Sequence, residues 1–306
     1  MMQAKHESVL VDEVMETLSV RPDDVVVDAT LGGAGHFTKL LAALGAGGSI
    51  LGIDADAAAV DRARTLYGED RRTDRPTAYL VNDNFRNLTH ILERLDIGEI
   101  DKCLFDLGWS GYQIAMPRGF SFQGDEPLLM NYDVANSDET AAALVNQLPE
   151  VELAELISSY GEERFARSIA RSIVSLRGQE RILTTAQLVR AIMAGVPRWY
   201  RERKVHPATK TFQALRMAVN DEVGALRDGI GAALRALAPG GRLAIISFHS
   251  IEDRIVKEIL RFAVEEGLGT LVAKKPIVPT RAELLANRRA RSAKLRVFER
   301  AIPAYA

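Results

Sequence analysis

A glycine-rich turn near the start of the chain constrains its fold more than any other feature. The segment reads DATLGGAGHFTKLL over residues 28–41, and it follows the apolar run VVVDA at 25–29. A strand, a glycine turn and a helix in this order place free backbone N–H groups and a helix N-terminus beside a ligand. The ligand could be a dinucleotide, a bare phosphate or something else, and each choice implies a different class of protein.

Short apolar runs alternate with helical segments through the first third of the chain. Strand signals at 25–29, 49–54, 77–85 and 101–108 have helical segments between them, among them 36–44 and 57–66. This alternation is typical of βαβ units, in which helices cover both faces of a parallel sheet. It predicts an α/β fold for this part of the chain.

The alternating pattern stops after Ser110 and resumes near residue 241. A long loop rich in glycine and proline at 116–133 precedes mainly helical segments, one of them behind a Thr184-x-x-Gln187 capping box. The last third contains too few strands to close a sheet by itself. We therefore predict one discontinuous α/β domain, residues 1–113 and 207–306, and an inserted helical domain for substrate recognition, residues 114–206.

Composition bounds the class of protein. The 306 residues include a single cysteine, Cys103, so an intrachain disulfide is excluded. The longest uncharged stretch near the start, residues 40–53, is too short to span a bilayer, and acids near the N-terminus argue against a signal peptide. We expect a cytoplasmic protein that does not bind a membrane.

Net charge is −2, but the basic residues are clustered. Nine basic residues lie between Lys274 and Arg300 against only Glu283 and Glu299, and the segment RWYRERK at 198–204 interleaves Trp199 and Tyr200 with four more. Such clusters can follow phosphates and stack on bases. They can equally be solvated faces, and charge alone leaves both interpretations open.

The glycine turn lacks the features that phosphate ligands require. No Gly-Lys-Ser/Thr tripeptide occurs, and a dinucleotide fingerprint beginning at Gly33 lacks its third glycine. Asp54 ends the second strand, 19 residues after Gly35, where a carboxylate can accept both ribose hydroxyls of a nucleoside. S-adenosylmethionine, a nucleoside with an amino-acid tail and no phosphate, fits this site; the alternative is a structural turn with an incidental surface aspartate.

Several longer segments carry a resemblance to one family. The chain resembles the RsmH/MraW family of bacterial 16S rRNA (cytosine-N4)-methyltransferases from one end to the other. The matching segments are HESVLVDEV (6–14), DATLGGAGH (28–36), GIDAD (52–56), RGFSF (118–122), YGEERFARSIARSIV (160–174), HPATKTFQALRMAVNDE (206–222), LAPGGRLAIISFHSIEDRIVK (237–257) and ARSAKLRVFER (290–300).

The resemblance implies an α/β fold of the class I (Rossmann-like) S-adenosylmethionine-dependent methyltransferases, with an inserted all-helical domain. It also implies methylation of the exocyclic amine of a cytidine near the decoding site, with 16S rRNA in the small ribosomal subunit as partner. The residues at the family's cofactor-binding positions are Ala34, Gly35, His36, Asp54, Phe85, Asp106 and Gln113. For Phe85, a place against the adenine face and a place in the core both stay open.

Asp106 is the first candidate for a catalytic residue. It stands in DLGW at the end of the fourth strand, where acceptors for the N4 hydrogens of cytosine belong in an open α/β sheet. Trp109 is predicted to stack on the target base. His249, in SFHS ahead of a second expected capping box at Ser250–Asp253, is predicted to bind the base or a phosphate, or merely to satisfy its loop.

The five histidines show no ligand spacing, so we predict no catalytic metal. The sequence leaves open whether the protein forms a homodimer. The loop DLGWSGYQ differs from the family's usual D-L-G-V-S-S-P-Q and bears on the identity of the methylated base. Two alternatives therefore accompany rRNA cytosine-N4 methylation: a related methyltransferase acting on another RNA position, and an RNA-binding or assembly factor that binds the cofactor without using it.

Overall fold

The computed structural model describes residues 8–68, 75–108, 116–132 and 139–303. The chain forms two compact units, one made of residues 1–111 and 223–306 and the other of residues 112–222. The second boundary therefore lies after Glu222, not at the expected position between residues 206 and 207. The reason is helix α11 (Ala208–Val219), which buries Phe212, Leu215 and Val219 in the core of the helical unit.

The described residues of the first unit form a seven-stranded sheet in the order β3-β2-β1-β4-β5-β7-β6. β7 runs antiparallel to β5 and β6, and the other neighbours are parallel. The predicted α/β fold of class I methyltransferases is confirmed. The strands are β1 (Val25–Asp28), β2 (Ser49–Asp54), β3 (Thr77–Asn82), β4 (Ile100–Asp106), β5 (Leu237–Ser247), β6 (Gly269–Leu271) and β7 (Lys294–Arg300).

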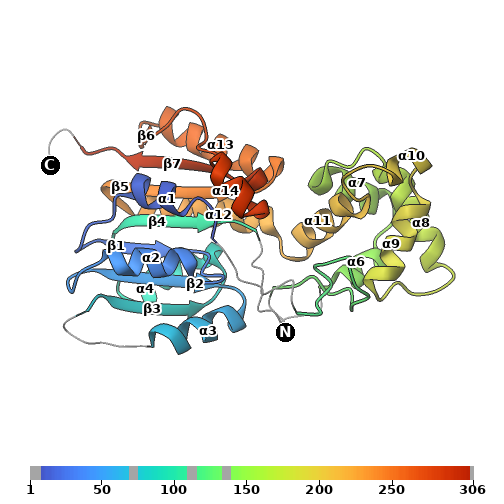
Figure 1. Ribbon diagram of the computed structural model, residues 1–306, viewed down its shortest axis with the longest axis horizontal. Helices are drawn as coiled ribbons and strands as arrows, with labels where there is room; N and C mark the ends of the chain where they lie inside the picture. The colour runs from blue at the N-terminus through green and yellow to red at the C-terminus, as the bar shows by residue number, and fades with distance from the viewer. Residues whose placement is uncertain (1–7, 69–74, 109–115, 133–138, 304–306) are drawn as a thin grey trace. The chain divides into compact units, whose positions relative to one another are not determined.

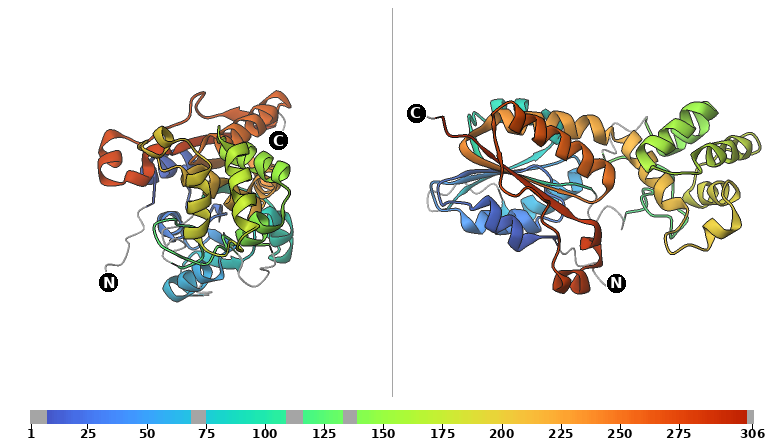
Figure 2. Two further views of the ribbon diagram at one scale, coloured as in Figure 1. Left: turned by 90° about the vertical axis from the view of Figure 1, so that its right-hand side faces the viewer. Right: turned by 90° about the horizontal axis from the view of Figure 1, so that it is seen from above.

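Helices cover both faces of this sheet (Figure 1). In the right-hand view of Figure 2, the blue helices α1 (Val11–Leu18), α2 (Gly35–Ala43) and α3 (Ala57–Tyr67) lie on one side of the sheet. The orange helices α12 (Glu222–Ala236) and α13 (Ser250–Glu265) lie on the other side, with α4 (Leu88–Arg94). The described residues of the unit also form the short elements η1 (Phe85–Asn87), α14 (Arg281–Ala286) and η2 (Arg288–Ser292).

The core between α1–α3 and the sheet follows from the apolar periodicity of both. Helical residues one turn apart share a face, and strand residues two apart do so as well. Val14 and Leu18 of α1 and Phe37 and Leu40 of α2 are fully buried, and they pack in one cluster with strand residues. The strand residues include Val26, Ile50, Leu104, Ile246 and Leu295.

The sequence predicts one long helix from about residue 207 to Leu237, ended by the stop APGG at 238–241, but this helix is divided in the structure. α11 ends at Val219 and α12 begins at Glu222, because Asp221 between them has a left-handed backbone with φ 42°. The Asn220 amide donates to the Met130 and Arg216 carbonyls, which fixes the break. Gly224, Gly229 and Gly231, which put the continuity of that helix in doubt, lie inside α12, and β5 begins at Leu237, directly before the stop expected at 238–241.

The helical unit has a core of its own. Its helices are α6 (Ala141–Gln147), α7 (Glu150–Gly161), α8 (Ala166–Arg177), α9 (Thr185–Ala194), α10 (Arg198–Arg201) and α11. Ile157, Ile169, Leu188 and Leu215 are fully buried together, and the expected capping box of Thr184 with Gln187 opens α9. Among the helices of the described residues, none combines the length and apolar character that crossing a bilayer requires.

Candidate functional site

The carboxyl ends of β1, β2 and β4 bring three aspartates to one edge of the sheet. Asp28 ends β1, Asp54 ends β2 and Asp106 ends β4. β1 lies between β2 and β4, and the strand order reverses at the β1/β4 pair. In open α/β sheets, ligands bind beside the carboxyl ends of the strands at such a reversal. The topology therefore places the candidate site here.

Asp54 holds the glycine turn in place through both carboxylate oxygens. Oδ2 accepts the N–H of Gly32 at 2.7 Å, and Oδ1 accepts the N–H of Asp56 at 2.8 Å. Burial raises the pKa of Asp54 to about 6, although these two hydrogen bonds favour the ionised form. A carboxylate oxygen has two lone pairs. Asp54 can therefore accept ribose hydroxyls while it shapes the turn.

The turn leads directly into the N-terminus of α2. Ala34 stands at the N-cap in the left-handed region, and no side chain caps the helix there. A Cβ at Gly35 would lie 2.0 Å from Ser8 Oγ and 3.1 Å from Ser8 Cβ, so a larger residue there would require the Ser8 side chain to move. Uncapped N–H groups at a helix N-terminus are available to a polar ligand. Ala34 and Gly35 thus lie where the sequence predicts cofactor contacts.

His36 is buried, and its two ring nitrogens face different groups. Nε2 lies 3.0 Å from the Val9 carbonyl oxygen, and Nδ1 lies 3.4 Å from Asp106 Oδ2. A carbonyl oxygen only accepts, so Nε2 carries a proton, and Nδ1 donates toward Asp106 Oδ2 when the imidazole is protonated. Burial opposes a charged imidazole, yet the hydrogen bond and charge of Asp106, with the charge of Asp28, raise the pKa of His36. In this geometry His36 contacts Asp106 through Nδ1 and the Val9 carbonyl through Nε2.

Asp28 and Thr30 complete this group, and neither is among the site residues predicted from the sequence. Burial raises the pKa of Asp28 to about 7, against the attraction of His36 and the N–H of Thr30. The Thr30 hydroxyl accepts the backbone N–H of Asp106 at 2.7 Å, which ties the end of β4 to the turn after β1. The available signal was an acid at the end of an apolar strand, immediately before the glycine turn.

One carboxylate oxygen in this group has no partner. Asp106 Oδ1 is buried and accepts no hydrogen bond from any described residue, whereas Oδ2 faces His36. An unpaired buried polar atom is costly unless a ligand or water satisfies it. Asp106 Oδ1 therefore marks the position where an N–H or O–H donor of a ligand would bind.

Phe85 opens η1 after an Asn84 cap and is half-buried. Its ring packs edge-to-face on Phe105 of β4, with centroids 5.3 Å apart. A Cβ at Gly229 of α12 would lie 2.6 Å from the Phe85 ring. The ring is thus fixed by core contacts on one side and keeps part of its surface exposed, so both interpretations of Phe85 describe part of its environment.

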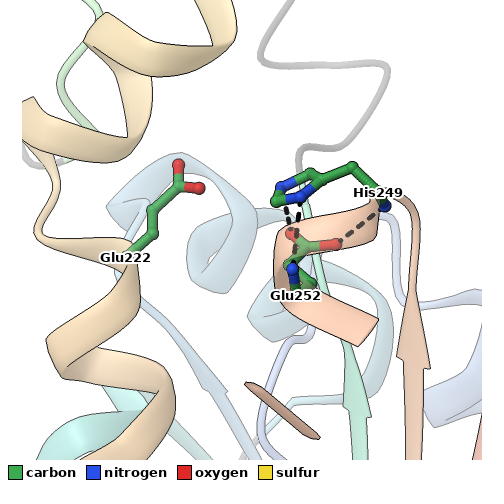
Figure 3. Close-up of side chains that lie close together, drawn as sticks. All are labelled: Glu222, His249 and Glu252. Atoms are coloured by element: carbon green, nitrogen blue, oxygen red, sulfur yellow. Dashed lines mark hydrogen bonds and ion pairs between the residues drawn. The ribbon is translucent and has the colours of Figure 1, made fainter. Parts of the chain in front are cut away.

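His249 is held by Glu252, as Figure 3 shows. Its Nδ1 accepts the Glu252 N–H at 3.3 Å, and its Nε2 lies 3.0 Å from Glu252 Oε1. The capping box of α13 is therefore formed by His249 and Glu252, and the expected box at Ser250–Asp253 is wrong by one residue. Asp253 instead binds Lys294 and Arg296, each at 2.8 Å. This geometry gives His249 a structural role at the start of α13, and because its Nε2 is buried without a hydrogen-bond partner among the described residues, binding of the base or a phosphate stays a prediction.

Figure 3 also draws Glu222, the last residue of the helical unit. Its carboxylate accepts the Tyr132 hydroxyl at 2.9 Å and pairs with Arg216 at 2.8 Å. These partners give Glu222 a structural role at the start of α12. The absence of a catalytic metal stays a prediction.

Two predicted site residues, Trp109 and Gln113, lie outside the described residues. The structure thus brings together Ala34, Gly35, His36, Asp54 and Asp106, with Phe85 following β3 at the same edge of the sheet. Their roles toward a ligand remain predictions.

Comparison with known proteins gives a match over almost the whole chain. The model of the MraW methylase family matches residues 3–301. A ribosomal RNA small subunit methyltransferase H from Deinococcus radiodurans is 48% identical, and the match covers 97% of this chain and 90% of that protein. The protein of the same name from a Paenibacillus strain is 42% identical over 97% of this chain and 99% of its own length.

Solved structures show a weaker likeness. A crystal structure of an rRNA methylase from Streptococcus thermophilus matches 95% of this chain and 93% of its own, with 14% identity and a TM-score of 0.42. The strand order, and not this similarity, carries the assignment of the fold.

Proposed function

This chain belongs to the MraW methylase family, and on that premise we propose that it methylates the N4 amine of a cytidine in 16S rRNA near the decoding site. Membership makes the chain a methyltransferase whose cofactor is S-adenosylmethionine and whose substrate is small-subunit ribosomal RNA. The observation that supports an amine as acceptor is the unpaired buried Oδ1 of Asp106, which can accept an N–H of an –NH2 group. The choice of the N4 amine over a hydroxyl comes from the family resemblance.

The described residues fit the cofactor. S-adenosylmethionine contains no phosphate, and the uncapped N-terminus of α2 with its glycine turn offers N–H groups without a phosphate-binding lysine. We propose that Ala34 and Gly35 hold the cofactor through the backbone, and that Asp54 accepts the ribose hydroxyls. Phe85 contributes the free part of its ring, and Gln113 is proposed on the resemblance alone.

The cofactor supplies a methyl group that is already activated by its sulfonium, so the chain has mainly to align the acceptor. The lone pair of cytosine N4 is delocalised into the ring, which makes the amine a weak nucleophile. A hydrogen bond from N4–H to Asp106 Oδ1 favours a pyramidal nitrogen and takes up the charge that develops on it. Transfer of the methyl group would break its bond to the sulfonium sulfur and would leave the new N–CH3 nitrogen with one proton too many. We propose that Asp106 Oδ1 receives that proton.

His36 acts on this reaction through Asp106. Its Nδ1 faces Asp106 Oδ2, while the Val9 carbonyl fixes the proton on Nε2. The carboxylate is thereby oriented with Oδ1 directed away from the imidazole. We propose His36 as a positioning residue, in place of the direct cofactor contact that the resemblance implies.

Recognition of the RNA is assigned to the helical unit together with the basic C-terminal segment. The helical unit carries RWYRERK on and after α10, and the residues of that segment other than Tyr200 are exposed. We propose a cytoplasmic enzyme, since its substrate is ribosomal RNA. Substrate binding by Trp109 remains part of the proposal.

Nucleoside analysis tests the proposed function. Small subunits that lack the modification are incubated with methyl-labelled S-adenosylmethionine, and their RNA is then digested to nucleosides. Label in N4-methylcytidine supports the proposal, and label in another nucleoside contradicts it. Intact cofactor binding without any incorporation would instead identify the chain as a binding or assembly factor.

A further inference from the structure

Trp199 on α10 presents an aromatic ring to solvent within the helical unit. Its side chain is 51% exposed, although tryptophan usually buries its large apolar surface. A single exposed aromatic residue is common and means little by itself. The surroundings of Trp199 distinguish it from the other exposed apolar side chains of this unit.

Two aromatic side chains pack against the Trp199 ring. Phe165 packs against it at 5.9 Å between centroids with planes tilted by 67°, and Tyr200 packs perpendicular to it at 5.7 Å. Tyr200 is buried, and its hydroxyl donates to Glu163 Oε2 at 2.7 Å. The other oxygen of Glu163 accepts the N–H of Phe165 at 2.9 Å, which closes the network. An exposed ring fixed in this way loses little conformational entropy when a ligand stacks on it.

Two cations lie over this aromatic cluster. The guanidinium carbon of Arg164 is 5.3 Å from the centre of the Trp199 ring and 4.9 Å from that of Phe165. The guanidinium carbon of Arg203 is 5.3 Å from the centre of the Tyr200 ring. Within the described part of the chain neither arginine forms an ion pair, and both are exposed. Their charge is therefore available to an anionic ligand.

The chemistry of the surface selects the class of ligand. An apolar protein partner would bury Arg164 and Arg203 without carboxylates to pair them, and such burial is costly. An unpaired stretch of RNA offers both groups that this surface can bind. Every base has a π-face that can stack on the indole, and every linkage has a phosphate that can pair with an arginine. Duplex RNA keeps its bases stacked inside the helix and would leave the indole unused.

We propose that Trp199, Arg164 and Arg203 form a stacking platform for one unpaired nucleotide of the RNA substrate. The base stacks on the exposed face of Trp199, and the two arginines bind the adjacent phosphates. This inference rests on the proposed function, because it takes RNA as the substrate. The platform offers no hydrogen-bonding pattern specific to one base, so it binds a nucleotide other than the target and leaves the choice of the methylated base to the methyltransferase unit.

The fluorescence of Trp199 tests the stacking directly. The chain has two tryptophans, so Trp109→Phe leaves Trp199 as the sole indole. A short unstructured oligoribonucleotide should quench its emission in a saturable manner, and added salt should weaken the binding. The same strand annealed to its complement should quench far less. Unchanged emission at RNA concentrations that saturate binding, measured by anisotropy of labelled RNA, would overturn the proposal, as would equal quenching by the duplex.

Kinetics on undermethylated small subunits separate this platform from the chemistry. Trp199→Ala should raise KM for the subunit by about 5- to 150-fold, with kcat nearly unchanged, since stacking on one base is lost. Trp199→Phe should recover most of that loss. Val151→Ala, which removes another exposed apolar side chain of the helical unit, is the matched control and should leave KM unchanged.

The two proposals fail in different ways. If Trp199→Ala methylates with the KM of the unsubstituted chain, the platform is wrong and the proposed function stands. If no label enters any RNA while Trp199 is still quenched by single-stranded RNA, the proposed function is wrong and the platform stands. Circular dichroism of each variant confirms that a change in KM does not come from unfolding.

Discussion

Asp28 illustrates how one buried residue can couple the site to stability. It is 1% exposed at the end of β1, and burial raises its pKa to about 7, while the group titrates near 3.8 when exposed to water. Between these two values the folded chain binds more protons at Asp28 than the unfolded chain does. Its contribution to stability is therefore present at low pH and is lost as the pH rises through 7.

Asp28→Asn removes this dependence, and it keeps an oxygen that can accept the Thr30 N–H. At pH 8 the variant should be more stable than the unsubstituted chain by a few kcal/mol, on the order of 1.4 kcal/mol per unit of pKa shift. At pH 4 the two should differ little. Urea unfolding at both pH values measures the difference, and Asp23→Asn, at an exposed position, is the control. An equal gain at both pH values would contradict the assigned titration.

The hydrogen bonds of Asp54 allow a specific prediction about its role in cofactor binding. Asp54→Asn replaces an ionised acceptor of the Gly32 and Asp56 N–H groups by a neutral amide. The affinity for S-adenosylmethionine, measured by calorimetry, should fall by about 10- to 100-fold, since hydrogen bonds to charged groups contribute roughly 1.5–3 kcal/mol each. Asp61→Asn, on the exposed side of α3, should bind as the unsubstituted chain does. Unchanged affinity in Asp54→Asn would refute its assignment to the cofactor.

For helices and strands, sequence and structure agree where the apolar periodicity is strong. They differ where a local hydrogen bond determines the end of a helix. The strands ending in Asp28, Asp54 and Asp106 could be predicted, because apolar runs followed by turn residues determine them. The α11–α12 break at Asn220 and the His249 cap of α13 could not. Both depend on side chains that replace the expected backbone or capping partners, which periodicity does not encode.

The same limit applies to the candidate site. Asp54 and the glycine turn follow from spacing, and family resemblance adds Phe85 and Asp106. The link from Val9 through His36 to Asp106 joins residues far apart in the sequence, so only the fold reveals it. The sequence therefore predicted that His36 belongs to the site, whereas its position behind Asp106 required the structure.

Helix α12 offers a test of how an element fixes the site. A Cβ at Gly229 would lie 2.6 Å from the Phe85 ring, while one at Gly231 would meet only the end of the Arg235 side chain, at 3.4 Å. Gly229→Ala should therefore displace Phe85, lower the melting temperature and weaken binding of S-adenosylmethionine. Gly231→Ala in the same helix should be neutral or stabilising by about 0.5–1 kcal/mol. Equal effects of the two substitutions would contradict the proposal that α12 positions Phe85 through Gly229.

In the whole molecule, residues 112–222 form a helical unit with its own core, and they are inserted between the two segments of the unit that contains the candidate cofactor site. The predicted boundary at 206/207 separated α11 from this core, because the sequence signal of one long helix ran from residue 207 to 237 and did not mark the break at Asn220. In the structure, the buried face of α11 packs with α6, α7 and α9 residues such as Val145, Ile157 and Leu188. A helix boundary, and not a loop, thus marks the end of the inserted unit.

Two fragments test this division. Residues 112–222 should unfold cooperatively on heating, because they contain the complete helical core. Residues 112–206 lack Phe212, Leu215 and Val219 and should show little cooperative unfolding, since each lost large side chain costs roughly 2–5 kcal/mol. Circular dichroism of both fragments against temperature measures this. Similar transitions in the two would place the boundary where the sequence suggested.

We propose that Asp106, held by His36, supports methyl transfer to an amine. The single-turnover rate of methyl transfer by Asp106→Asn tests this role, measured at saturating S-adenosylmethionine on small subunits that lack the modification. We predict a rate lower by about 100- to 10,000-fold, as expected for loss of a proton acceptor, with the cofactor still bound. A rate within a few-fold of the unsubstituted chain under these conditions would contradict the claim.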